Sequence, residues 1–412
     1  MRTAILLISL AGCAALSWTA ATLDALVILT GISLAAAGLL VRECSAGESA
    51  RAADVRVAAV CFSCLLGGAA FLLALTGTTS LAEISETLSA NYQPERSDLL
   101  AGRASMLGIV ASILVLAGTA LPIGLFPFQF SHSAFFDKAN GWQALATVSL
   151  VRLQGLGVLV RVLDVAGIGA ENSVQVLTGI SGAATCLAGA ALLCRVESLR
   201  MIASHLWLVF GGLAVVAYSV GVTQPEVSPA QSIAGLPTEA TLVLMVTAIG
   251  LVVCVSLLAL EARLTREGRR PRHFEELTGL GRQAPGTAFL LAATLLAAVP
   301  IPPLPLFPTL LALAGSAFVP GVSPDGRQQE LPGAMPLLVL TATGLAWLLI
   351  GARLIQPLSQ MFHHEPLGRF QPAVGRWPLI VSGVCVVALV LTGLQPNLLT
   401  SSMAFLVAAT GR

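Results

Sequence analysis

The chain has 412 residues, of which 56% are hydrophobic and 10% are charged, and its formal net charge is +1. An average soluble domain is about 25% charged, so this composition, with apolar segments from end to end, excludes disorder, a soluble globular fold and a coiled coil. The balanced charge also excludes the concentrated basic footprint of a nucleic-acid-binding protein. The sequence therefore predicts a polytopic membrane protein.

Eleven segments are apolar enough to cross the hydrocarbon core of a bilayer, which needs about 20 mostly apolar residues. In chain order they are residues 4–21, 25–41, 55–77, 104–126, 142–164, 174–194, 200–222, 238–261, 287–315, 336–360 and 377–394. None of them alternates polar and apolar residues as a membrane-spanning strand does. We therefore expect an all-α polytopic membrane protein of about eleven transmembrane helices.

The lysines and arginines outside these segments are distributed unevenly between the two sides that the eleven-span topology defines. Thirteen lie on the side of the N-terminus, and four, Arg96, Arg103, Arg327 and Arg412, lie on the other side. Cytoplasmic loops of membrane proteins carry the excess of positive charge. The asymmetry predicts a cytoplasmic N-terminus and an external C-terminus.

Two of the segments contain prolines where a transmembrane helix should be continuous. The fourth runs into Pro122 and Pro127, and the ninth holds five prolines, including Pro302 and Pro303. Proline removes a backbone donor and clashes with the preceding turn, so we expect both helices to be broken. Broken backbone at membrane depth is tolerated only where it is buried in protein or lines a polar cavity.

Each interrupted segment is the fourth in a group of five, so the two occupy matching positions in two halves of the chain. Halves with an odd number of helices have opposite orientations, and the pattern therefore favours an inverted repeat of the kind found in transporters. The alternative is that prolines are simply frequent in membrane helices. We expect a first five-helix repeat in residues 1–165, a second in residues 170–362, and a C-terminal transmembrane helix and tail in residues 363–412.

Few ionisable side chains lie at membrane depth. Arg152 in the fifth segment and His205 in the seventh are candidates for a polar path, because ionisable residues inside the membrane are costly and usually functional. The alternative is structural: Arg152 anchors neighbouring helices, and His205 is a packing residue. Arg353 is interpreted as an interfacial anchor. The eight cysteines lack the four-ligand pattern of a structural metal site, and we predict neither a metal site nor a catalytic residue in this chain.

The two interrupted regions resemble a known family. The matching residues around the first are Pro127-Phe128-Gln129-Phe130, Asp137-Lys138-Ala139-Asn140-Gly141, Ala146-Thr147-Val148-Ser149 and Arg161; around the second they are Leu277-Thr278-Gly279-Leu280 to Pro285, and Val299-Pro300-Ile301-Pro302-Pro303 to Phe307. These motifs resemble the antiporter-like membrane subunits of respiratory complex I, and among them subunit N of NADH-quinone oxidoreductase. The likeness extends from roughly residue 25 to residue 395.

The resemblance implies an antiporter-like membrane subunit of a proton-translocating NADH:quinone oxidoreductase in the cell inner (plasma) membrane. It implies no redox cofactor in this chain, because NADH and quinone are handled by partner subunits. The implied partners are other complex I membrane subunits and the lipid bilayer, and no nucleic acid. Family members have about three further helices before two inverted five-helix repeats, and this chain looks like the two repeats plus one final helix.

The chain departs from the family where protons are thought to pass, at a glutamate and several lysines. By the resemblance, the glutamate and lysine positions fall on Thr30, Pro122, Leu150 and Leu310, and the histidine of the family's proline turn falls on Gln129. The single lysine, Lys138, lies outside every predicted span. Two alternatives therefore stay open: a degenerate, non-conducting structural subunit of such a complex, or a separate cation/proton antiporter-like transporter.

Reporter fusions at Gly268 and Ser323 test the predicted topology. The loop around Gly268 carries the densest arginine run, so a fusion there should report the cytoplasmic side, and a fusion at Ser323 should report the external side. If both fusions report the same side, the segment between them is a re-entrant hairpin and the eleven-span topology is wrong.

Overall fold

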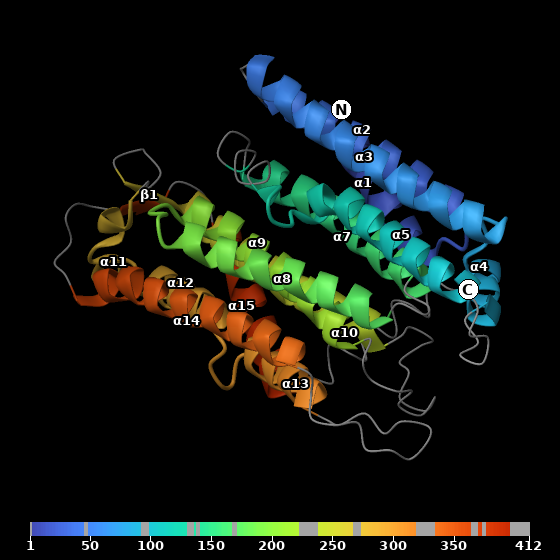
Figure 1. The fold of residues 1–412 in the computed structure, drawn as a ribbon. Helices are drawn as coiled ribbons and strands as arrows, with labels where there is room; N and C mark the ends of the chain where they lie inside the picture. Colours follow the sequence, from blue (N-terminus) through green and yellow to red (C-terminus); the bar gives the residue numbers. More distant parts are fainter. Residues whose placement is uncertain are drawn as a thin grey trace. The chain divides into compact units, whose positions relative to one another are not determined.

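A computed structural model describes residues 2–44, 48–91, 99–129, 136, 141–166, 171–221, 238–266, 273–318, 334–363, 370–372 and 376–395. The positions of Lys138, Gly268, Ser323 and Arg412 lie outside these ranges. The described chain is nearly all helical (Figure 1). It divides into two compact units, Met1–Ser181 and Gly182–Arg412, with the boundary inside one helix, α8.

Within the described residues, the first unit has six complete helices and the start of α8. They are α1 (Arg2–Thr19), α2 (Leu23–Cys44), α3 (Glu48–Thr76), α4 (Leu81–Asn91), α5 (Leu99–Ile123) and α7 (Gly141–Ala166), followed by α8 (Glu171–Leu193). Helix α7 is central, because α1, α2, α4 and α5 all pack against it. Its charged and amide side chains are therefore positioned against several helices at once.

The second unit contains the remaining helices and a small sheet. The helices are α9 (Leu199–Gly221), α10 (Thr238–Arg263), η2 (Phe274–Leu277), α11 (Leu280–Gln283), α12 (Pro285–Ala297), α13 (Leu306–Phe318), α14 (Ala334–His363) and α15 (Trp377–Leu394). Strands β1 (Leu264–Arg266) and β2 (Phe370–Pro372) pair antiparallel, with Thr265 opposite Gln371. Nearly every residue of α9 is buried, as expected for a helix that is apolar all round.

The described helices agree with the predicted membrane segments. Nine of them are long and apolar enough to cross a membrane, while Thr3–Thr19 of α1 and Pro285–Ala297 of α12 are shorter apolar helices. Every predicted segment coincides with a described helix, the ninth with α12 and α13 together. The all-α, multi-pass character is thus confirmed, whereas the count of eleven spans and the inverted repeat remain predictions.

Candidate functional site

The first proline-containing helix, α5, ends where the sequence analysis placed an interruption. The helix passes through the buried Pro122 and ends at Ile123, three residues earlier than the predicted span. Gly124 comes next, with φ of 82°, a left-handed conformation that glycine adopts without steric cost. The peptide bond between Phe126 and Pro127 is cis. Residues 130–135 and 137–140, which connect this turn to α7, lie outside the described chain.

Arg152 contacts the end of α5 directly. The side chain lies in α7 and is 1% exposed, and its Nε donates a hydrogen bond to the carbonyl oxygen of Ile123 at 2.8 Å. In a continuous α-helix that carbonyl would accept from the N–H of residue 127, but residue 127 is a proline and has none. The guanidinium therefore supplies the donor that Pro127 lacks, at a helix end that also favours a positive charge.

A second polar contact joins α7 to α2. It is made by Gln154, two residues after Arg152 on α7. The Nε2 atom of Gln154 lies 2.7 Å from the hydroxyl oxygen of Thr30, and that hydroxyl donates to the carbonyl of Leu26 at 2.8 Å. Because the single hydroxyl proton of Thr30 is used on Leu26, Gln154 must be the donor, which fixes the orientation of its amide. Both side chains are buried. At the position where the resemblance places a glutamate, this chain has Thr30, whose hydroxyl accepts a hydrogen bond from the side-chain amide of Gln154.

Further contacts fix α7 against the last turn of α1 and the residue that follows that helix. The indole Nε1 of Trp18 donates to the carbonyl of Leu153 at 3.0 Å, and Nη2 of Arg161 donates to the carbonyl of Ala20 at 2.9 Å. Leu150 packs against an apolar cluster on the same helices. The cluster is formed by Leu10, Ala36, Leu40 and Val151, with Leu6, Leu7 and Ala37 at its edge. Leu150, one of the predicted lysine positions, thus lies among hydrocarbon groups.

Gln129, in the first unit, and His205, in the second, are the other polar candidates. Gln129 is 3% exposed, and its Oε1 has no hydrogen-bond partner within the described part of the chain. His205 is buried in α9, with Nδ1 2.6 Å from the carbonyl oxygen of Met201 one turn earlier. Since a carbonyl only accepts, Nδ1 carries the proton. This hydrogen bond is local to the histidine's own helix, which agrees with the packing interpretation.

The second interrupted helix is described on both sides of its interruption. Helix α12 ends at Ala297 and α13 begins at Leu306, so eight residues between them are not α-helical. Pro302 and Pro303 are exposed and joined by a cis peptide bond. The expected break is confirmed. Leu310, a further predicted lysine position, lies partly buried on α13.

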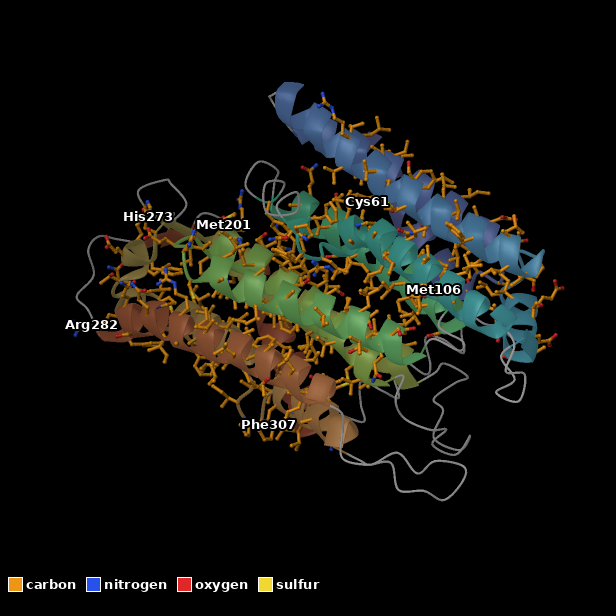
Figure 2. The ribbon with its side chains drawn as sticks, in the orientation of Figure 1. Cys61, Met106, Met201, His273, Arg282 and Phe307 are labelled. Atoms are coloured by element: carbon orange, nitrogen blue, oxygen red, sulfur yellow. The ribbon has the colours of Figure 1, made fainter. Side chains whose placement is uncertain are left out.

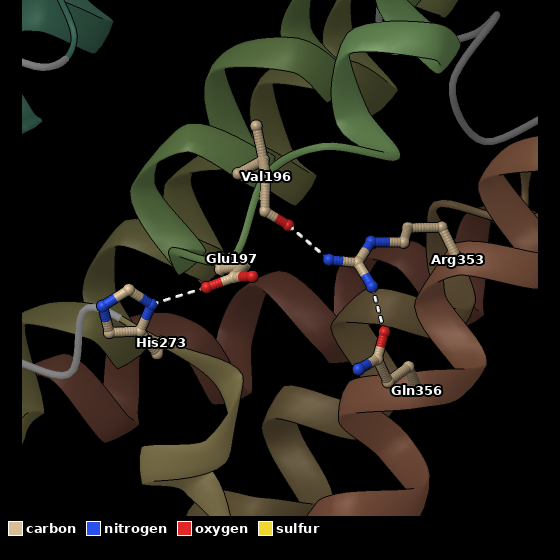
Figure 3. Close-up of polar contacts among 5 residues, drawn as sticks. All are labelled: Val196, Glu197, His273, Arg353 and Gln356. Carbon is tan, nitrogen blue, oxygen red and sulfur yellow. Dashed lines mark hydrogen bonds and ion pairs between the residues drawn. The ribbon is translucent and has the colours of Figure 1, made fainter.

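Arg353 organises a polar cluster in the second unit (Figure 3). Its Nη2 donates to the carbonyl of Val196 at 2.7 Å, its Nη1 bonds Gln356, and its guanidinium lies 5.0 Å from the ring centroid of Phe274. Nearby, Nδ1 of His273 lies 2.6 Å from a carboxylate oxygen of Glu197. His273 lies toward the same end of the unit as Arg282, with Phe307 toward the other (Figure 2).

Sequence analysis singled out Arg152 and Arg353 but could not name their partners, since both donate to backbone carbonyls. It also missed a buried set of three hydroxyls, on Ser256, Thr294 and Ser382. Isolated serines and threonines are common in membrane helices, where they bond the preceding turn. Only the tertiary arrangement distinguishes the three that meet one another.

The fold and these contacts define an all-helical, multi-pass membrane protein with an interrupted helix and a buried arginine at a helix end. No family model matches the chain. A curated relative, NADH-quinone oxidoreductase subunit N 2 of Syntrophobacter fumaroxidans, is 27% identical over 292 residues, which are 70% of this chain and 55% of that protein. Subunit N of Rhizorhabdus wittichii is 26% identical over 261 residues, 62% of this chain and 49% of that protein.

The chain thus spans about half the length of the curated relatives it matches. Among solved structures, a chain of respiratory complex I from Thermus thermophilus matches with a TM-score of 0.68 at 16% identity, over 97% of this chain and 79% of that one. A chain of the Mrp complex from Dietzia sp. matches with a TM-score of 0.68 at 16% identity, over 95% of this chain and 39% of that one. A chain of the archaeal membrane-bound sulfane sulfur reductase matches with a TM-score of 0.69 at 14% identity, over 95% of this chain and 73% of that one.

These comparisons confirm the resemblance found in the sequence. The curated relatives carry the name subunit N, and the structural neighbours are chains of respiratory complex I, of an Mrp complex and of the membrane-bound sulfane sulfur reductase. At such identities the likeness to the solved structures is one of fold.

A double-mutant cycle tests the contact between Thr30 and Gln154. We expect Thr30→Val and Gln154→Leu each to lower the free energy of unfolding in detergent by about 1 kcal/mol, with a coupling energy of about 0.6–1.5 kcal/mol, as for hydrogen bonds between membrane helices. Thr341→Val is the matched control, because that exposed hydroxyl bonds its own helix. Strictly additive effects at the two sites would contradict the contact.

Proposed function

We propose that the chain is an antiporter-like membrane subunit of a proton-translocating NADH:quinone oxidoreductase. The observation that carries the proposal is the fold match over 97% of the chain to a chain of respiratory complex I, together with homologues named subunit N. The subunit lies in the cell inner membrane, with its N-terminus cytoplasmic and its C-terminus external. Residues 1–165 and 170–362 are its two inverted repeats.

Redox chemistry belongs to other chains in this proposal. NADH and quinone are handled by partner subunits, and this chain holds no redox cofactor and is not catalytic in isolation. Its partners are the other membrane subunits of the complex and the lipid bilayer. Its own contribution is the helical scaffold around the interruptions at α5 and between α12 and α13.

A second candidate function is that of a non-conducting structural subunit in such a complex, and the polar contacts of α7 favour it. A proton relay needs groups that gain and lose protons near neutral pH. The guanidinium of Arg152 does not, because arginine stays protonated in proteins, and the amide of Gln154 and the hydroxyl of Thr30 do not either. The contacts of these residues hold helices together.

A separate cation/proton antiporter is supported less well. Such a transporter would need a buried acid or lysine to exchange its ion. The single lysine lies at position 138, and the predicted acid and lysine positions hold threonine, proline and leucine. The scaffold of the antiporter-like fold is present without those exchange groups.

Purification of the tagged chain from its native membrane in mild detergent tests the proposal. We expect the other membrane subunits and the redox subunits of an oxidoreductase to co-purify with it and to be identified by mass spectrometry. An untagged strain serves as the control for non-specific capture. Recovery of the chain alone, from membranes in which those oxidoreductase subunits are detected, would contradict membership of the complex.

A further inference from the structure

Helix α15 contacts both sides of the interruption between α12 and α13. It packs against α10 and α12 and also touches α13. Two features of α15 carry these contacts, one on each side of the point where α12 ends. The first is a chain of hydroxyls, and the second is a glycine.

The hydroxyl chain joins three helices and has a defined direction. The hydroxyl oxygen of Ser256 on α10 lies 2.7 Å from that of Thr294 on α12 and 2.7 Å from that of Ser382 on α15. Thr294 donates its only hydroxyl proton to the carbonyl of Leu290 at 2.8 Å. Ser256 must therefore donate to Thr294, and Ser382 must donate to Ser256. All three residues are fully buried.

This chain of hydroxyls ends close to the interruption. Thr294 lies three residues before Ala297, the last residue of α12. The last turn of α12 is closed by hydrogen bonds from the N–H of Ala298 to the carbonyl of Leu295 and from the N–H of Val299 to the carbonyl of Leu296. Ser382 reaches that turn through Ser256, and it thereby ties the end of α12 to α15.

The second contact is a close approach of α15 to the connection itself. A Cβ atom added to Gly393 would lie 2.9 Å from the Cα of Leu304 and would come still closer to the carbonyl oxygen of Pro303. Both neighbours are backbone atoms, which cannot move aside as the end of a flexible side chain can. Only glycine at position 393 lets α15 lie directly against the Pro303–Leu304 segment.

We propose that α15 sets the shape of the interruption between α12 and α13, with Ser382 and Gly393 as its positioning residues. Ser382 holds the end of the first half-helix, and Gly393 provides the surface against which Pro303 and Leu304 rest. The interruption is thus held from one continuous helix at two points, roughly three turns apart on α15. The inference concerns the shape of the interruption and stands whether or not the complex translocates protons.

Labelling of an introduced cysteine measures that shape. Ile301 is 40% exposed within the interruption, so Ile301→Cys in the intact complex is labelled with a polar maleimide, and the chain without this change gives the background from native cysteines. Adding Gly393→Ala forces the backbone of Pro303 to move. Because such overpacking costs at least about 1 kcal/mol, we expect the labelling rate of Ile301→Cys with Gly393→Ala to differ from that of Ile301→Cys alone by about fivefold or more.

Gly383→Ala is the matched control, because a Cβ at that position of the same helix meets no atom within 4 Å. We expect its labelling rate at Ile301→Cys to equal that of the parent. Equal rates in the parent, Gly383→Ala and Gly393→Ala would overturn the role of Gly393. Equal changes in the two alanine variants would overturn it as well, since the effect would then be general to α15.

Ser382→Ala removes the hydrogen bond from Ser382 to Ser256 without adding volume. This variant therefore tests the proposal even if Gly393→Ala reduces the amount of assembled chain. Ser256→Ala should change the labelling rate more than Ser382→Ala, because it also removes the donor to Thr294. Thr247→Ala on α10 is the control, since the hydroxyl of Thr247 donates to Val243 of its own helix. If Ser382→Ala and Ser256→Ala label at the parent rate, the hydroxyl chain does not position the interruption.

Discussion

The structure depends on one constraint, which is that backbone polar groups inside a membrane must find partners within the protein. Pro127 removes the donor for the carbonyl of Ile123, and that carbonyl is buried where water cannot replace the donor. The Nε of Arg152, on the neighbouring helix α7, donates a hydrogen bond to this carbonyl at 2.8 Å. The same guanidinium holds the end of α5 against α7. Gln154, half a turn further along α7, holds α2 against α7 through its hydrogen bond to Thr30.

The second unit meets the same constraint in a different way. The contacts near the end of α12 are between neutral groups: hydroxyls on three helices share protons near Thr294, and α15 lies against the connection at Gly393. Neutral hydroxyls cost less to bury than a charge, but they reach only short distances. The helices must therefore approach closely, and serine and glycine on α15 permit this.

Much of the fold could be predicted from the sequence, because span length and proline position are local properties. The helix end after Pro122 and the gap around Pro302 both lie where the prolines indicated. The partners of buried polar groups could not be predicted, because a backbone carbonyl leaves no mark in the sequence. One signal was available: a proline at position 127 implies an unsatisfied carbonyl at 123, and Arg152 is the deepest charged donor in the next predicted span.

We propose that Arg152 secures the end of α5 and does not carry protons. The most direct test is proton uptake against quinone reduction in vesicles containing the oxidoreductase complex proposed above, with Arg152→Leu measured beside the parent. Loss of the guanidinium leaves the Ile123 carbonyl without its donor, so we expect the variant subunit to be retained less well in the complex. The number of protons moved per electron pair by the intact complex should equal that of the parent. A lower ratio in a fully assembled complex would contradict the claim.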